Sequence, residues 1–170
     1  MAITLLVIRH AIAEDKDAFA RTGRPDDERP LTKRGRTVMA EVAKGLRREL
    51  PSLDILASSP LVRAAQTASI VAAEYDEMPV VMVSALEPDQ APHVFSAWLA
   101  AQKRARVVAA VGHEPHLGAL VTWLLSGLRS SHVEIEKGGA CLIEITPKPG
   151  PRCATLVWSL PPSVLARRAR

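Results

Sequence analysis

A nearly unbroken apolar run from Ile3 to Ile8 is the feature that most restricts how this chain can fold. Its residues do not alternate between apolar and polar, so the run predicts a strand buried on both faces. Such a strand needs cover on both sides, which is typical of α/β proteins in which crossover helices flank a parallel sheet. The run ends directly in Arg9 and His10.

Strand and helix patterns alternate along the rest of the chain. The expected strands are 3–8, 53–57, 79–83, 106–111, 139–145 and 154–160, and the expected helices are 32–50, 59–75, 91–102 and 117–128. Thr32 is the expected N-cap of the first helix, and Ser59 with Pro60 is expected to start the second. The residues from 14 to 29 predict a loop, and the basic tail from 164 to 170 predicts a solvated end.

This order of elements predicts the fold class. We expect a single α/β domain over residues 1–170, built as a three-layer α/β/α sandwich. Its central sheet should be mostly parallel with right-handed crossovers. The last two strands should form a hairpin that adds an antiparallel edge, with its turn around 147–151.

Composition and spacing narrow the classes of function. The formal net charge of +4 suits an acidic substrate but lacks the dense basic patch of a nucleic-acid binder. The apolar start is short with no basic region before it, and 117–128 is too short to span a bilayer, so we expect a cytoplasmic protein away from membranes. The two cysteines lack metal-binding spacing, the residues His113 to His116 do not form an H-E-x-x-H motif, and no phosphate-binding Gly-rich motif occurs. We therefore expect no metal and no cofactor.

Three expected strands each lead into residues that suit phosphate. The first strand ends in Arg9 and His10, the second is followed closely by Arg63, and the fourth by His113. Ligands in open α/β sheets bind at the carboxyl ends of the strands. If these strands are parallel neighbours, the four side chains meet in one crevice.

These residue types suit phosphoryl transfer. Guanidinium groups hold phosphate oxygens and stabilise their charge. A neutral imidazole can attack phosphorus and form a covalent intermediate, and nearby guanidinium charges disfavour the imidazolium. A helix start after Ser59 would add backbone N–H donors, which makes Ser59 a further candidate contact. Each pattern alone is more often structural, as a loop, a helix cap or a turn; the joint occurrence at strand ends favours a site.

Four segments resemble the motifs of the histidine phosphatase (phosphoglycerate mutase-like) superfamily. They are 6–11 (LVIRHA), 29–35 (RPLTKRG), 58–68 (SSPLVRAAQTA) and 111–115 (VGHEP). Within that superfamily, the short length and these motifs are most similar to the small bacterial phosphohistidine phosphatases of the SixA type. The chain differs in Ala11, where the superfamily usually has Gly, and so the loop has to accept ordinary backbone dihedrals there.

The resemblance implies roles for individual residues. It implies that His10 is the nucleophile and that Arg9, Arg63 and His113 bind phosphate and stabilise the transition state. It also implies Arg29 as a further phosphate contact. Glu87 lies near the place where many members carry an acidic residue, so it is the candidate general acid, ahead of Asp89.

We therefore expect a metal-independent phosphatase that acts on phosphohistidine in a phosphorylated protein and releases inorganic phosphate. One alternative is a phosphatase for small phosphate esters that uses the same site. Another is a phosphate-binding module without catalysis. A mutase is the least favoured enzyme, because the chain lacks a long insertion for a lid that would shield the phosphoryl group from water.

Overall fold

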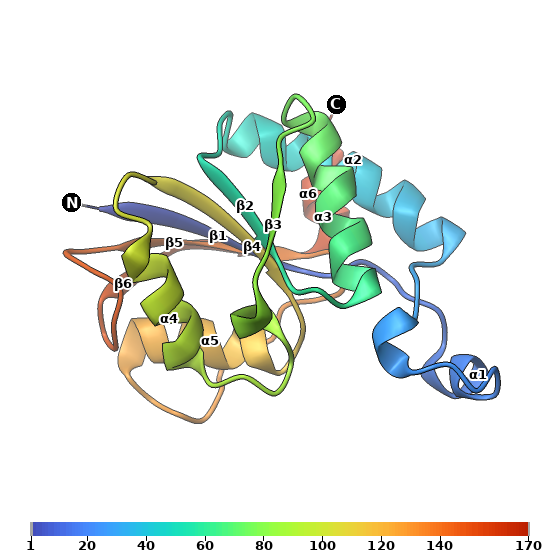
Figure 1. The fold of residues 1–170 in the computed structure, drawn as a ribbon. Coiled ribbons are helices and arrows are strands. Elements are labelled where there is room, and N and C mark those ends of the chain that lie inside the picture. Colours follow the sequence, from blue (N-terminus) through green and yellow to red (C-terminus); the bar gives the residue numbers. More distant parts are fainter. Residues whose placement is uncertain (1, 170) are drawn as a thin grey trace.

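The computed structural model describes residues 2–169 as an α/β fold in which helices cover both faces of one sheet (Figure 1). The strands are β1 (Ile3–Arg9), β2 (Ile55–Ser58), β3 (Val80–Met82), β4 (Val107–Gly112), β5 (Ala140–Ile145) and β6 (Ala154–Leu160). The α-helices are α1 (Lys16–Ala20), α2 (Lys33–Glu49), α3 (Val62–Glu74), α4 (Pro92–Ala101), α5 (His116–Ser126) and α6 (Pro162–Arg167). Short 3₁₀ helices span Asp26–Glu28 and Ser84–Leu86.

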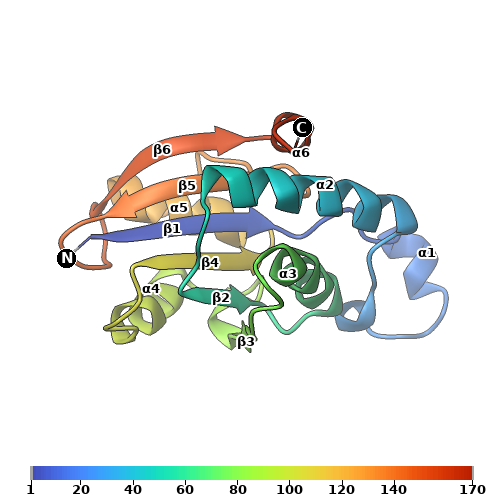
Figure 2. The ribbon, with the colours of Figure 1, turned by 90° about the horizontal axis from the view of Figure 1, so that it is seen from above.

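The strand order is β3-β2-β4-β1-β5-β6. Strands β3, β2, β4 and β1 are parallel, while β5 and β6 are antiparallel to their neighbours. Arg9 is in register with Gly112 and Ser58 with Val111, so β1, β4 and β2 end at the same edge of the sheet. Helix α1 lies beyond this edge (Figure 2). The expected mostly parallel sheet with an antiparallel edge is confirmed.

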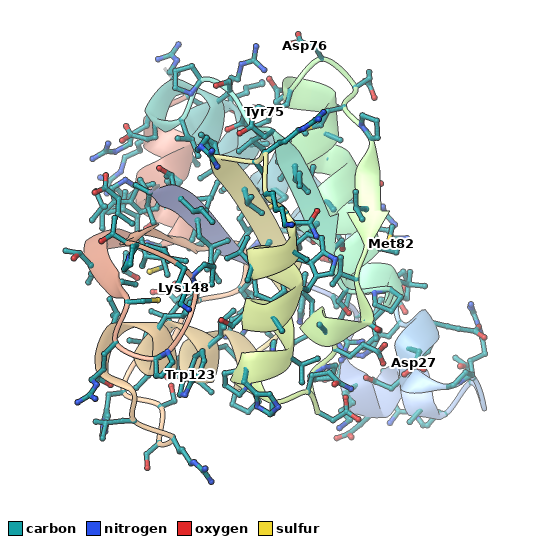
Figure 3. All side chains as sticks on the ribbon, turned by 60° about the vertical axis from the view of Figure 1, so that its left-hand side comes forward. Asp27, Tyr75, Asp76, Met82, Trp123 and Lys148 are labelled. Carbon is teal, nitrogen blue, oxygen red and sulfur yellow. The ribbon has the colours of Figure 1, made fainter. Side chains whose placement is uncertain are left out.

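Strand β1 divides the core into two halves. Leu5 and Val7 belong to the half that contains side chains of α4 and α5, and Leu6 and Ile8 to the half beneath α2, α3 and α6. All four side chains are fully buried. The expectation that this strand is covered on both faces is confirmed. The outer strand β3, in contrast, leaves Met82 exposed at the edge of the sheet (Figure 3).

Helix boundaries agree with the sequence in part. Thr32 caps α2, since its hydroxyl accepts a hydrogen bond from the Gly35 N–H at 2.9 Å. The expected start of α3 at Ser59 is wrong: the helix begins at Val62, and its N-cap, Leu61, provides no side-chain hydrogen bond. The expected end of the helix at residue 128 is two residues too late: Gly127 adopts a left-handed conformation and ends α5 at Ser126.

Two segments expected to lack regular structure form short helices. Helix α1 lies within the expected loop, with Asp15 as its N-cap and Phe19 buried. Helix α6 begins just before the expected solvated tail and extends into it, burying Leu165 against α2. Helices of five and six residues have too few apolar positions to show a helical period, and each of them buries a single side chain.

The contact between α2 and α6 depends on Gly45. A Cβ atom at this position would lie 2.0 Å from the carbonyl oxygen of Leu165. Gly45→Ala should gain about 0.5–1 kcal/mol of helix propensity but lose more through the clash with the α6 backbone, so the free energy of unfolding should fall by about 1–2 kcal/mol. Urea denaturation tests this. Gly150→Ala is the control, because a Cβ there meets no atom within 4 Å; equal stability of the two variants would contradict the prediction.

Among residues 2–169, no helix combines the length and the apolar character required to cross a bilayer.

Candidate active site

A cavity of about 660 Å³ lies at the carboxyl ends of the central strands. Its wall combines the end of β1, the segment that carries α1 and the first 3₁₀ helix, the start of α3 and the residues after β4. The lining residues are Arg9, His10, Ala13, Glu14, Asp15, Lys16, Asp26, Arg29, Arg63, Pro88, His113, Glu114 and Lys137. The structure thus places Arg9, His10, Arg63 and His113, from three neighbouring strand ends, in one cavity, together with Arg29.

His10 is held in a defined orientation. Its Nδ1 lies 2.7 Å from the carbonyl oxygen of Ala11. A carbonyl can only accept a hydrogen bond, so Nδ1 carries the proton of the neutral ring. The lone pair of the neutral imidazole is then on Nε2, which leaves this nitrogen as the potential nucleophile.

Burial is the largest cause of a lowered pKa at His10, which falls from 6.5 to about 4. The hydrogen bond to Ala11 raises the pKa, while the positive charges of Arg63, Arg9 and Arg29 lower it. The guanidinium charges therefore act in the expected direction, but burial has the larger effect. The imidazole is neutral at pH 7, as a nucleophile has to be.

Ala11 follows the nucleophile without strain. It is absent from the residues with positive φ within 2–169, so the position accepts an ordinary side chain. Its N–H donates to Thr67 Oγ1 at 3.0 Å, which ties the loop after β1 to α3. The departure from the superfamily's usual Gly is therefore tolerated by the backbone.

His113 lies beside His10, with their ring centroids 5.2 Å apart. Its Nε2 is 2.8 Å from Ser59 Oγ, and its Nδ1 is buried without a hydrogen-bond partner in the described part of the chain. Burial lowers the pKa of His113 to about 3, with further lowering by His10 and Arg63. Ser59 is fully buried and is not a lining residue, so it orients His113 rather than contacting the cavity.

Asp26 connects two of the cavity's arginines. Its carboxylate accepts a hydrogen bond from Arg29 Nε at 2.7 Å and lies 3.2 Å from Arg63 Nη1. The same nitrogen donates to the Asp26 carbonyl at 3.0 Å. The hydrogen bond from Arg29 is the main reason why the pKa of Asp26 is lowered, so the group is an anion at neutral pH. Arg63 Nε is buried without a partner among residues 2–169.

Asp26 was missed by the sequence analysis. The sequence does contain one indication of its pairing with Arg29. Asp26 precedes Arg29 by three residues, a separation at which side chains on one helical turn can pair. The Lys137 and Lys16 side chains, which are exposed and line the cavity, were also missed because neither follows a strand end.

Glu87 is not among the lining residues, whereas its neighbour Pro88 is. Glu87 follows the 3₁₀ helix Ser84–Leu86 and is half-buried. The carboxylates that do line the cavity are Glu14, Asp15, Asp26 and Glu114. Within residues 2–169, no group of three or more His, Cys, Asp or Glu side chains is placed to hold a metal ion.

The two lowered histidine pKa values predict acid-sensitive stability. Histidines of the unfolded chain titrate near 6.5, whereas native His10 and His113 stay neutral until about pH 4 and 3. The unfolded state therefore binds more protons below pH 7, and the free energy of unfolding should fall by about 2 kcal/mol between pH 7 and 5.5. Urea denaturation at the two pH values tests this. His113→Asn should show a smaller fall; an unchanged wild-type stability would contradict the prediction.

Comparison with known proteins places the chain in a family. The sequence profile of the histidine phosphatase superfamily (branch 1) matches residues 5–87. An uncharacterized protein of Picosynechococcus sp. is 36% identical over 139 residues, which cover 79% of this chain and 81% of the relative. The chain belongs to the histidine phosphatase superfamily. As a member of this superfamily, it is a hydrolytic phosphatase.

Solved structures share the fold at low identity. The protein histidine phosphatase SixA in complex with tungstate has a TM-score of 0.80 at 22% identity, covering 96% of this chain and 99% of that chain. The alpha-ribazole phosphatase from Shigella flexneri has a TM-score of 0.71 at 20% identity, covering 91% and 94%. Phosphoserine phosphatase from Entamoeba histolytica, in complex with 3-phosphoglyceric acid, has a TM-score of 0.67 at 16% identity, covering 92% and 96%. These likenesses establish the phosphoglycerate mutase-like fold.

Proposed function

We propose that this phosphatase removes phosphate from phosphohistidine in a protein, through a phosphohistidine intermediate on His10. The observation that carries the proposal is the hydrogen bond from His10 Nδ1 to the Ala11 carbonyl. It leaves Nε2 with its lone pair, in a cavity that also holds Arg9, Arg63 and His113.

In the first step, His10 Nε2 attacks phosphorus. A new N–P bond forms as the bond from phosphorus to the leaving group breaks, and the leaving group takes the electron pair and a proton from solvent water. Arg9 and Arg63 hold the non-bridging oxygens and stabilise their charge in the transition state. Arg29, held by Asp26, is a further contact for these oxygens.

In the second step, water attacks phosphorus, and the bond to His10 Nε2 breaks. The water supplies the oxygen and the protons of the released phosphate, and His10 returns to its neutral form with Nδ1 protonated. His113 lies beside His10 and is neutral at pH 7, so the N–H of its ring can donate a hydrogen bond to a phosphoryl oxygen.

The two candidate substrates differ in how much their leaving groups need protonation by an acid. A phosphohistidine P–N bond needs less acid assistance than a phosphate ester, and Glu87, the candidate general acid, is not in the cavity wall. Its role as an acid stays a prediction. The likeness to SixA in fold, and a 660 Å³ cavity with exposed Lys16 and Lys137 in its wall, support a phosphorylated protein as the substrate.

A small phosphate ester is the second candidate. The fold likeness to alpha-ribazole phosphatase and phosphoserine phosphatase supports it. In that case, one of the lining carboxyl groups, such as Glu14, would have to protonate the leaving alcohol.

The test compares kcat/KM for a phosphotransfer protein carrying phosphohistidine with kcat/KM for p-nitrophenyl phosphate and sugar phosphates. We expect the highest value for the phosphoprotein. A higher value for any small ester would overturn the substrate assignment and leave the phosphatase assignment intact.

A further inference from the structure

Glu114 lies in the wall of the cavity, yet its carboxylate is bound to the backbone of two other segments. Oε1 accepts a hydrogen bond from the Ile135 N–H at 3.0 Å, and Oε2 accepts one from the Gly118 N–H at 3.2 Å. Ile135 belongs to the segment between α5 and β5, and Gly118 lies in the first turn of α5. The side chain thus ties this connecting segment to the start of a helix that packs in the core.

The same connecting segment holds Arg9. The Ile135 carbonyl oxygen accepts a hydrogen bond from Arg9 Nη1 at 2.8 Å. Arg9 Nε is buried without a partner among residues 2–169, and the hydrogen bond to Ile135 is what ties the guanidinium to the protein. A continuous series of hydrogen bonds therefore runs from Gly118 through Glu114 and Ile135 to Arg9.

The packing at Gly118 shows how closely the segment approaches the helix. A Cβ atom at Gly118 would lie 2.1 Å from the Val133 carbonyl oxygen and 2.8 Å from Glu114 Oε2. The Ile135 side chain is itself buried in the core. The position of the Ile135 carbonyl is thus fixed from one side by core packing and from the other by Glu114.

We propose that Glu114 is a positioning residue for phosphate binding, which acts through the Ile135 backbone to aim the Arg9 guanidinium into the cavity. The proposal rests on the proposed function in one respect, namely that Arg9 holds the phosphoryl oxygens. An arginine binds a phosphate well when its planar fork of donors is fixed in advance, because less side-chain entropy is lost on binding. Glu114 provides this preorganisation without touching the phosphate.

Glu114→Gln is the variant that tests the proposal. The amide keeps the size of the side chain, but its NH₂ group cannot accept a hydrogen bond, so either Ile135 or Gly118 loses its partner. We expect the Kd for inorganic phosphate, measured by calorimetry, to rise about tenfold. Glu136→Gln is the matched control, since Glu136 is exposed and lies next to Ile135; its Kd should equal that of the wild type.

A double-variant comparison shows whether the effect passes through Arg9. Arg9→Lys keeps the positive charge but removes the guanidinium that bonds to Ile135. In this background, Glu114→Gln should change the phosphate Kd less than twofold. An equal effect in both backgrounds, or an unchanged Kd in Glu114→Gln alone, would overturn the proposal.

Gly118→Ala provides a second route if Glu114→Gln does not fold. Its Cβ displaces the connecting segment at Val133 and should weaken phosphate binding in the wild-type background but not in Arg9→Lys. Because inorganic phosphate is the probe, these results do not depend on the identity of the phosphorylated substrate. Failure of the phosphohistidine assignment would therefore leave this proposal standing, and the reverse also holds.

Discussion

His10→Asn should reduce kcat at least about 1000-fold, because it removes the nitrogen that accepts the phosphoryl group. The Asn amide can still donate a hydrogen bond near the position of His10 Nδ1, toward the Ala11 carbonyl, so the loop after β1 should keep its shape. Its carboxamide has no nucleophilic lone pair on nitrogen at the place of Nε2. Phosphate release from a phosphohistidine protein, followed over time, measures the loss.

Two further measurements distinguish loss of the nucleophile from loss of phosphate binding. Wild-type enzyme quenched during turnover should carry phosphate that is labile in acid and stable in base, as expected for a phosphoimidazole, and His10→Asn should carry none. The variant should still bind inorganic phosphate, because Arg9 and Arg63 remain. His93→Asn is the control, since His93 is exposed and is not in the cavity wall. Substantial turnover by His10→Asn would rule out His10 as the nucleophile.

The strands of the sheet could be predicted because each is marked in the sequence by a short local run of apolar residues. The Ile3 to Ile8 run has no polar alternation, and double burial is the physical cause of that pattern. The meeting of Arg9, Arg63 and His113 follows from parallel strands that end at one edge. Helices α1 and α6 escaped prediction because each is too short to show a helical period and buries a single side chain, Phe19 or Leu165.

Contacts within the site were less accessible from the sequence. Ser59 and Pro60 have the residue types of a helix start, but the hydroxyl of Ser59 lies against His113 and the helix begins later. In the sequence, Glu114 is only a residue of the His113 motif, and nothing there indicates that its carboxylate reaches Ile135. Such contacts depend on how loops fold over the sheet, which local patterns do not determine.

Arg63→Met should lower kcat/KM about 100- to 1000-fold, the range for loss of one preorganised donor to a developing anionic charge. Arg63 is 5% exposed, and its Nη1 is fixed by the carbonyl and carboxylate oxygens of Asp26. Its remaining donors are therefore oriented before the substrate arrives. Methionine fills a similar volume but offers no donor and no charge. Initial-rate kinetics and phosphate binding by calorimetry measure the two consequences, and the Kd for phosphate should rise at least about tenfold.

Loss of Arg63 also changes the electrostatics around it. Its charge lowers the pKa values of His10, His113 and Asp26, so all three should rise in Arg63→Met, and the decline of activity in acid should begin at higher pH. Arg47→Met removes the same charge from the last turn of α2, where Arg47 pairs with Asp76 and lies over the Tyr75 ring. Tyr75 and Asp76 follow the C-terminal end of α3, far from the cavity (Figure 3). Wild-type kinetics are expected for this control. If folded Arg63→Met kept kcat/KM within about threefold of the wild type, phosphoryl transfer could not depend on Arg63.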